Sequence, residues 1–76
     1  MKRLNEFTPG QSCRLAEVGG ERAFRRRLME LGFLPGTVVR LVRRVDVGGL
    51  VELEVRGSHI GLRRSEASQL LFELER

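Results

Sequence analysis

Turn-forming residues recur at short intervals along this chain and limit the length of every secondary-structure element. Nine glycines occur among the 76 residues, and pairs made of glycine or proline stand at 9–10, 19–20, 35–36 and 48–49. Such pairs mark turns, because glycine adopts backbone angles that other residues avoid and proline lacks the N–H that helices and sheets need. The chain therefore has room only for short elements, which is typical of a single domain built mainly from strands.

Strand patterns fill most of the segments between these turns. Apolar and polar residues alternate at 12–18, at 50–55 and at 70–74, whereas 37–45 is rich in β-branched residues. Alternation with a period of two predicts a strand with one buried face, and β-branched residues favour strands. We therefore expect strands at these four places.

A two-residue turn at Arg56 and Gly57 predicts a hairpin between the third strand and a further strand at 58–62. Such a turn fixes the register. The predicted pairs are Val55 with Ser58, Glu54 with His59, Leu53 with Ile60 and Val51 with Leu62. The inner pairs join apolar to apolar and charged to polar side chains, which supports the hairpin, although arginine is a poor residue for a left-handed turn position.

One segment, 21–31, has the periodicity of an amphipathic helix. Phe24, Leu28 and Leu31 are spaced four and three residues apart, so they form one apolar stripe. Gly32 follows at the position where helices commonly end in a left-handed residue. A second, single helical turn is expected at 66–68, with Ser65 as its cap.

The predicted order is a strand, a helix, a meander of three strands, a helical turn and a final strand. Five short strands and one helix cannot bury a flat sheet at this size, whereas a sheet that curls into a barrel has no exposed edges. We therefore expect a mainly β fold: one SH3-like barrel domain spanning 1–76. The helix is expected to cover one open end or flank of the barrel.

The charge balance is basic, because 14 lysines and arginines face 10 acidic residues and give a net charge of +4. All but one of the basic residues are arginine, which pairs well with carboxylate or phosphate. The N-terminal segment has no apolar run, and no stretch is long and apolar enough to span a membrane. We therefore expect a cytoplasmic protein without direct membrane insertion. The single cysteine, Cys13, permits no intramolecular disulfide.

The sequence lacks the residue sets that carry catalysis. It has no Ser-His-Asp combination, no phosphate-binding glycine loop and no zinc motif, so we expect neither an enzyme nor a cofactor. Alternation turns Cys13 inward and His59 outward, so these two side chains cannot easily share a metal ion. We expect a buried Cys13 and a surface pair of His59 with Glu54. A weak metal site at His59 with Glu52 or Glu54 is the alternative, since a closed site needs about four ligands.

An eight-residue segment at 29–36 combines a helix end with a turn and reads Met-Glu-Leu-Gly-Phe-Leu-Pro-Gly. It resembles the ELG-x-x-PG signature of the ferrous iron transport protein A (FeoA) family. Arg26 and Leu28 precede it as the family's R-x-L does. The segments 55–63 and 66–70 resemble the family's later hairpin and ending, so the resemblance runs from about residue 4 to residue 74.

The resemblance implies an SH3-like cytoplasmic domain that assists FeoB, a permease of the bacterial inner membrane that carries Fe²⁺ and has a GTP-binding domain. The expected function is therefore that of an accessory protein of ferrous iron uptake, acting by contact with this permease. A similar domain ends metal-responsive repressors, so a stand-alone relative of that domain is an alternative. The chain has no helix-turn-helix segment, which disfavours a repressor.

Three arginines of the predicted helix are candidates for the partner contact. Arg22, Arg25 and Arg26 lie away from the apolar stripe. They form either a solvated face paired with Glu21 and Glu30 or a docking patch for an acidic surface. A further alternative is an arginine supplied in trans to the GTPase site of the permease.

The loop after the helix supplies the other candidates. Phe33, Leu34 and Pro35 put two large apolar side chains into a turn. They either fold back over the end of the barrel or present an exposed apolar anchor to the partner. Pro35 and Gly36 have the chemistry of a type II turn in either case.

A small RNA-binding barrel is the rival from another functional class, since Sm-like and KOW-type barrels share this size and charge. Aromatic residues make up only 5% of the chain, with no Trp or Tyr, so platforms for base stacking are scarce. An Sm-like protein also begins with its helix, whereas a strand comes first here. We therefore expect no nucleic acid partner, and the oligomeric state stays open.

Overall fold

The structure, a computed structural model, describes residues 1–74 and contains six strands and two α-helices. The strands are β1 (Lys2–Arg3), β2 (Ser12–Val18), β3 (Val38–Val45), β4 (Leu50–Val55), β5 (Ser58–Arg63) and β6 (Leu70–Phe72). The helices are α1 (Arg22–Glu30), between β2 and β3, and α2 (Arg64–Ala67), between β5 and β6. Two 3-10 turns lie at Leu4–Glu6 and Val47–Gly49.

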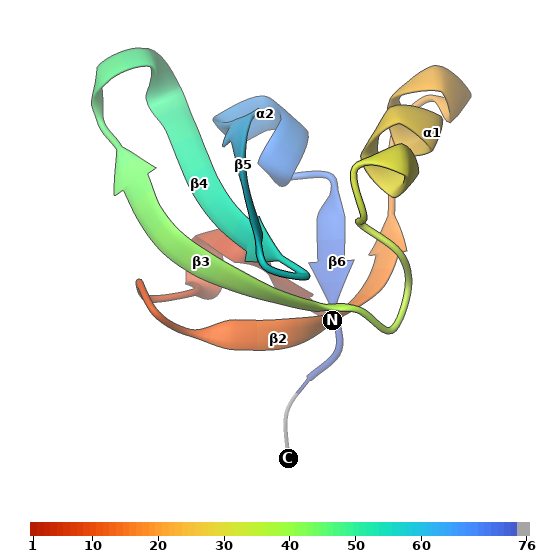
Figure 1. The fold of residues 1–76 in the computed structure, drawn as a ribbon, viewed down its shortest axis with the longest axis horizontal. Helices are drawn as coiled ribbons and strands as arrows, with labels where there is room; N and C mark the ends of the chain where they lie inside the picture. Colours follow the sequence, from red (N-terminus) through yellow and green to blue (C-terminus); the bar gives the residue numbers. More distant parts are fainter. Residues whose placement is uncertain (75–76) are drawn as a thin grey trace.

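The strands form one antiparallel sheet in the order β1-β6-β2-β3-β4-β5. The two halves of the sheet share β2: Cys13 pairs with Val39 of β3, and Leu15 pairs with Phe72 of β6. A bulge follows Leu15, and β-bulges bend and twist a strand. The sheet therefore wraps around a core, with the β3–β4 hairpin rising on one side and α1 on the other (Figure 1).

The sheet does not close, which corrects the expectation that the curled barrel has no exposed edges. Within the described residues, β1 and β5 are the two edge strands. The mainly β fold class is confirmed, with six strands in place of about five. The additional strand, β1, is two residues long and pairs with β6.

The predicted hairpin between β4 and β5 is confirmed residue by residue. All four predicted pairs are present, from Val55 opposite Ser58 to Val51 opposite Leu62. Arg56 has a φ of 53° and the following glycine a φ of 84°, so both turn residues are left-handed, as a type I′ turn requires. Among the described residues, Arg56 is the one non-glycine residue with positive φ.

The type II turn predicted after the helix is also confirmed. The N–H of Thr37 donates to the carbonyl oxygen of Leu34 at 3.0 Å, and Gly36 has a φ of 89°. A type II turn needs positive φ at its third residue, which glycine adopts without strain. Pro35 precedes it and suits the second position.

The helix α1 is one residue shorter at each end than predicted, which removes Leu31 from the apolar stripe. Leu28 is fully buried and Phe24 packs against the core, but Leu31 is 45% exposed. Leu31 is the C-cap of the helix, and its N–H donates to the carbonyl oxygen of Arg27 at 3.1 Å. Gly32 follows with a φ of 111°, which confirms a helix end with positive φ.

The second helical turn begins earlier than predicted, because Ser65 does not cap it. The helix α2 starts at Arg64, with Arg63 as the N-cap residue. Glu66 stabilises this start: its Oε1 accepts a hydrogen bond from the N–H of Arg63 at 2.9 Å. The carbonyl of Ser65, inside the helix, accepts a hydrogen bond from Oγ of Ser68 at 2.6 Å.

One cluster of buried apolar side chains fills the inside of the bent sheet. It draws residues from β2 to β6, from both helices and from the loops, and Phe33 and Phe72 are its largest fully buried members. Cys13 belongs to it, as predicted, and its Sγ donates to the carbonyl oxygen of Glu73 at 3.1 Å. The cysteine is therefore a small core residue with a satisfied thiol.

Candidate partner-binding groove

The outer face of α1 carries three arginines and a methionine. Arg22, Arg25, Arg26 and Met29 are spaced three or four residues apart, which places them on one helical face. Leu28, on another face, is fully buried and anchors the helix to the core. All three arginines are exposed, and Met29 keeps 45% of its surface accessible.

Backbone hydrogen bonds tie the loop after α1 to β2. The N–H of Gly36 donates to the carbonyl oxygen of Leu15 at 2.7 Å, and the N–H of Leu15 donates to that of Thr37 at 2.8 Å. Nη1 of Arg14 adds a hydrogen bond to the carbonyl oxygen of Gly36 at 2.7 Å. These bonds fix the turn, and with it Pro35, beside β2.

A groove of about 610 Å³ runs between α1, the end of β2 and this turn. The arginine and methionine face of α1 lines it, together with Glu17 and Val18 of β2, with Glu30 and with Pro35. Three arginines face two glutamates there, so the groove has an excess of positive charge. Val18, Met29 and Pro35 add apolar area. This combination suits a protein surface with exposed carboxylates around an apolar centre.

The structure brings four of the six predicted partner-binding residues together at this groove: Arg22, Arg25, Arg26 and Pro35. Leu34 is half-buried and does not line the groove. A binding role for these residues stays a prediction.

Phe33 follows the alternative in which the loop folds back over the end of the barrel, so its ring is not an exposed anchor for a partner. Its side chain is fully buried, with 0% of its surface exposed. The N–H of Phe33 donates to the carbonyl oxygen of Leu28 at 3.0 Å, so the chain turns inward directly after α1. The ring therefore joins the core.

Four groove residues were not predicted as part of a binding site: Glu17, Val18, Met29 and Glu30. The spacing of Met29 from Arg25 and Arg26 places it on their helical face, so this residue could have been found. Glu17 and Val18 reach the groove only because β2 runs past α1, and no local pattern signals that approach.

Among the arginines of α1, Arg27 lies outside the groove and has partners. It forms a salt bridge with Glu66 of α2. Its guanidinium carbon also lies 5.6 Å from the centre of the Phe24 ring, a distance that permits a cation–π contact. Arg27 therefore links the two helices.

The three groove arginines lack such partners. Arg22, Arg25 and Arg26 take part in none of the salt bridges formed among residues 1–74. The alternative in which these arginines pair with Glu21 and Glu30 is therefore not what the structure shows. Their guanidinium groups face solvent at the groove and can donate hydrogen bonds to carboxylates.

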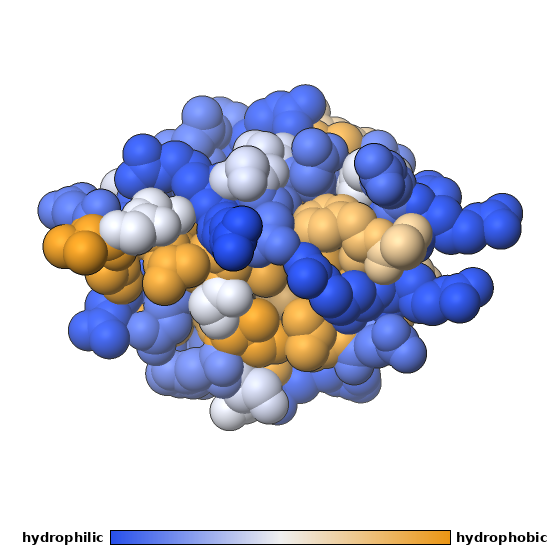
Figure 2. Space-filling view, turned by 90° about the horizontal axis from the view of Figure 1, so that it is seen from above, coloured by the Kyte–Doolittle hydropathy of each residue, from blue (hydrophilic) through white to orange (hydrophobic). Residues whose placement is uncertain are grey.

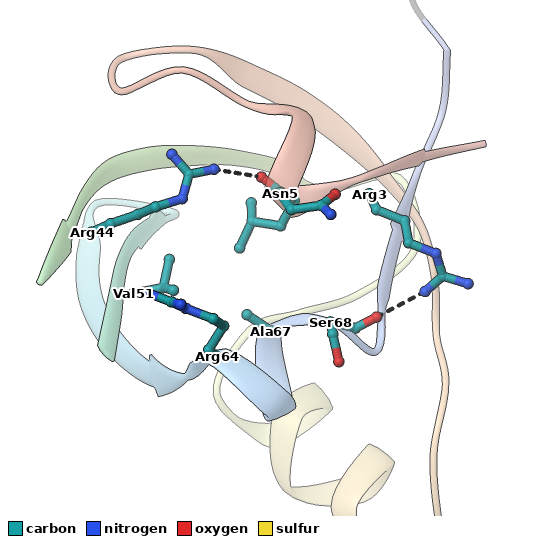
Figure 3. Close-up of a pocket in the computed structure, with 8 residues that line it drawn as sticks. Arg3, Asn5, Arg44, Val51, Arg64, Ala67 and Ser68 are labelled. Carbon is teal, nitrogen blue, oxygen red and sulfur yellow. Dashed lines mark hydrogen bonds between the residues drawn. The ribbon is translucent and has the colours of Figure 1, made fainter. Parts of the chain in front are cut away.

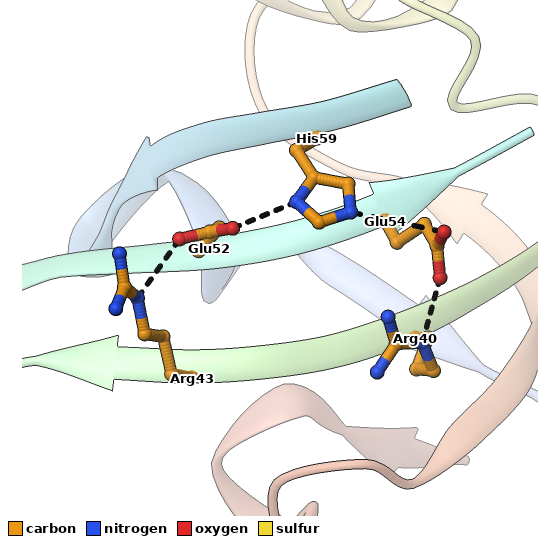
Figure 4. Close-up of polar contacts among 5 residues, drawn as sticks. All are labelled: Arg40, Arg43, Glu52, Glu54 and His59. Atoms are coloured by element: carbon orange, nitrogen blue, oxygen red, sulfur yellow. Dashed lines mark hydrogen bonds and ion pairs between the residues drawn. The ribbon is translucent and has the colours of Figure 1, made fainter. Parts of the chain in front are cut away.

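A second charged surface lies on the outer face of β3, β4 and β5 (Figure 4). Nε of Arg40 donates to Oε1 of Glu54 at 2.6 Å, and Nε of Arg43 donates to Oε1 of Glu52 at 2.9 Å. His59 lies between the two glutamates: Nδ1 is 2.8 Å from Oε2 of Glu52, and Nε2 is 3.8 Å from Oε2 of Glu54. The predicted pair of His59 with Glu54 is present, but Glu52 is the nearer carboxylate.

These contacts favour the ionised carboxylates. The hydrogen bond with His59, assisted by Arg43, lowers the pKa of Glu52, and the hydrogen bond from Arg40 lowers the pKa of Glu54. Partial loss of hydration raises the pKa of both groups and opposes this effect. The charges on this face are therefore paired with one another across the strands.

The same geometry limits metal binding at His59. Its two ring nitrogens point to different carboxylates, so an ion on either nitrogen meets Glu52 or Glu54 but not both (Figure 4). Throughout residues 1–74, no three side chains of His, Cys, Asp or Glu are grouped to hold one ion. Two ligands fall short of the four that closed zinc sites use.

Apolar surface is present on the face that carries both helices. Figure 2 shows it from the left end, at the turn between β3 and β4, into the lower centre, and again toward the right, beside α1, where hydrophilic side chains separate the two areas. Val47 at the β3–β4 turn is 85% exposed.

All four phenylalanines are buried or half-buried, so none offers the open ring on which a nucleic acid base would stack. Neither helix in the described part of the chain has the length and hydrophobicity to cross a membrane.

Comparisons with known proteins agree on one family. The family model described as FeoA domain matches residues 2–74. The Fe(2+) transport protein A/Fe(2+) transporter FeoB fusion protein of Porphyromonas gingivalis is 29% identical over 72 residues. That alignment covers 95% of this chain but only 8% of the fusion protein.

Two solved structures show the same fold. The FeoA protein from Chlorobium tepidum is 31% identical, with a TM-score of 0.84 over 92% of this chain and 67% of that one. Stenotrophomonas maltophilia FeoA, solved in complex with zinc and described as a prokaryotic SH3 domain protein, is 32% identical. Its TM-score is 0.79 over 96% of this chain and 91% of that one, which confirms the predicted SH3-like fold class. With a family model that spans almost all of the described residues, this chain belongs to the FeoA family.

Proposed function

We propose that this chain is a cytoplasmic accessory protein of ferrous iron uptake, which binds a FeoB-type permease through the groove between α1 and β2. The observation that carries the proposal is the P. gingivalis relative, in which a FeoA sequence and a FeoB transporter form one polypeptide. A covalent link holds two domains at a high effective concentration. Where the two are separate chains, a binding surface must replace that link.

The groove supports a contact of this kind. Arg22, Arg25 and Arg26 are exposed without salt-bridge partners in the described residues, so their charges are available to a partner. Met29 and Pro35 provide apolar area between them. Clustered positive charge accelerates the encounter with an acidic surface, and apolar contact slows its release. In this proposal the chain acts by binding, because its sequence carries no catalytic motif.

The test is a pull-down of the full-length permease and of its isolated GTP-binding domain by the purified chain. The variant Arg25→Glu reverses one groove charge, and Arg64→Glu, on α2, is the matched control because both side chains are exposed. We expect capture by the wild type and by Arg64→Glu, and weakened capture by Arg25→Glu.

Two outcomes would contradict the proposal. Absence of capture by either form of the permease, in every nucleotide state, would remove the accessory role. Equal weakening by both variants would mean that overall charge, and not the groove, governs binding. GTP turnover by the permease, measured in the same samples, tests the alternative of an arginine supplied in trans, which requires faster hydrolysis when the chain is added.

A further inference from the structure

A second cavity, here called the seam pocket, lies beside the edge strand β1. It has a volume of about 380 Å³ and is bounded by β1 and the following 3-10 turn, by β3 and β4, and by α2 (Figure 3). Leu4, Val51 and Ala67 line it with apolar surface, and each is at most 4% exposed. The volume falls within the range of about 300–1,000 Å³ that small-molecule pockets occupy. This seam pocket shares no lining residue with the groove beside α1.

The polar lining of the seam pocket is positively charged. Arg3, Arg44 and Arg64 belong to it, and no carboxylate does. Figure 3 shows Arg44 and Arg64 coming from opposite walls, from β3 and from α2. None of the three forms a salt bridge among residues 1–74. Guanidinium groups that share a pocket without an acid repel one another, and an anion between them would relieve that repulsion.

Two of these arginines also hold the walls of the pocket in place. Nη2 of Arg44 donates to the carbonyl oxygens of Leu4 at 3.0 Å and Phe7 at 2.9 Å. Nη1 of Arg3 donates to the carbonyl oxygen of Ser68 at 2.8 Å. A guanidinium has five N–H donors, so Arg44 keeps Nε and Nη1 for a ligand.

Arg64 supplies the second set of free donors. Its guanidinium group donates no hydrogen bond to any other residue of the described part of the chain. Arg64 is the first residue of α2 and lines the pocket together with the apolar residues. The Arg44 side chain is half-buried and held by its hydrogen bonds, whereas the Arg64 side chain is exposed and can adjust to a ligand.

We propose that the seam pocket binds an amphiphile with a carboxylate head and a short apolar body. The carboxylate lies between Arg44 and Arg64, whose planar guanidinium groups match its geometry. The apolar body covers Leu4, Val51 and Ala67. The ligand is either a free medium-chain carboxylate or the carboxylate end of an apolar peptide, since both present the same chemistry. This site does not depend on the groove or on the permease.

Calorimetric titration of the full chain with octanoate tests the proposal, because two matched probes each lack one feature. Octanol lacks the charge, and acetate lacks the apolar body. We expect octanoate to bind at least roughly tenfold more tightly than either, which corresponds to one charged hydrogen bond or a few buried methylene groups. Equal binding of octanoate and octanol, or of octanoate and acetate, would overturn the proposal.

Variants place the site on the protein. Arg64→Gln should weaken octanoate binding about tenfold by removing charged donors. Arg22→Gln, in the groove beside α1, should leave it unchanged and serves as the control. Arg44→Gln also removes the hydrogen bonds to Leu4 and Phe7 and is prone to unfold, so Arg64 carries the test. Equal affinities for wild type and Arg64→Gln would contradict the proposed site.

A pair of peptides distinguishes the two sources. A short apolar peptide with a free C-terminal carboxylate is compared with the same peptide amidated. Tighter binding of the free acid than of octanoate identifies a peptide carboxylate, and the reverse order identifies a free carboxylate. The absence of any preference for the free acid over the amide, together with no octanoate binding, would overturn the proposal.

Discussion

The groove beside α1 and the outer face of β3, β4 and β5 are both rich in charge, but only the arginines on the sheet are paired with acidic side chains. On the sheet, Arg40 and Arg43 are each bonded to a glutamate on the neighbouring strand. In the groove, Arg22 and Arg25 take part in no salt bridge that the described residues form. The difference shows that residue type alone does not tell which arginines are already paired within the fold. Arginines whose charge is already matched contribute to the fold, whereas unmatched ones are available to a partner.

The largest expected effect concerns the boundary between the groove and the core. Phe33→Ala removes a fully buried ring next to the groove and should lower the free energy of unfolding by about 3–5 kcal/mol. That loss approaches the whole stability of a domain this small, so chemical denaturation should show a mostly unfolded variant. Leu31→Ala, at a neighbouring half-exposed position, should cost roughly 1 kcal/mol or less. If Phe33→Ala kept its stability and lost only permease binding, the comparison would have to count Phe33 as part of the groove.

A smaller effect separates paired from unpaired arginines on the same helix. Arg27→Gln removes the salt bridge to Glu66 and the contact with the Phe24 ring. It should lower the free energy of unfolding by only about 0.5–1 kcal/mol, because the salt bridge is exposed to solvent. Arg25→Gln removes no such contact and should leave the midpoint of thermal unfolding unchanged. A loss of stability in Arg25→Gln equal to that in Arg27→Gln would show that the groove arginines also stabilise the fold.

The smallest expected effect is the pH dependence of the paired face. On this face, His59 lowers the pKa of Glu52 and Arg40 lowers the pKa of Glu54; on α2, the N–H of Arg63 lowers the pKa of Glu66. A carboxyl whose folded pKa is below its unfolded pKa stabilises the fold at neutral pH. This contribution is lost as the pH falls below about 4.3 and through the folded pKa.

Thermal unfolding between neutral pH and about pH 3 measures this dependence. Acidification should lower the melting temperature of the wild type more than that of Glu52→Gln, which has no carboxyl to protonate at this position. Glu17→Gln, in the groove, serves as the control and should follow the wild type. An identical acid response of Glu52→Gln and the wild type would show that the sheet pairs do not contribute to stability.

The sequence predicts the parts of the fold that have a local cause. Alternation locates β2 and β4, and the turn at Arg56 and Gly57 determines the register of β5 because two residues leave no freedom in the pairing. The helix α1 follows from the spacing of Phe24 and Leu28 and from the glycine after it. Each of these signals lies within about ten residues of the element that it determines.

The parts that were missed depend on distant contacts. The strand β1 has two residues, too few for any periodicity, and exists because Lys2 pairs with Phe72. The open seam between β1 and β5 depends on how far the whole sheet bends. Likewise, the arginines of the groove were predicted from α1 alone, but Glu17 and Val18 join them only through the path of β2. The burial of Phe33 also depends on the core that receives it.

The most direct test of the central claim is an NMR titration of the isotopically labelled chain with the GTP-binding domain of the permease or with the solubilised permease. The account predicts amide shifts concentrated on α1 from Arg22 to Glu30, on Glu17 and Val18, and on Gly36 within the turn. It predicts no shifts across β3, β4 and β5, where the charges are already paired. Shifts centred on Glu52, Glu54 and His59 with an unaffected α1, or no shifts at saturating permease, would contradict it.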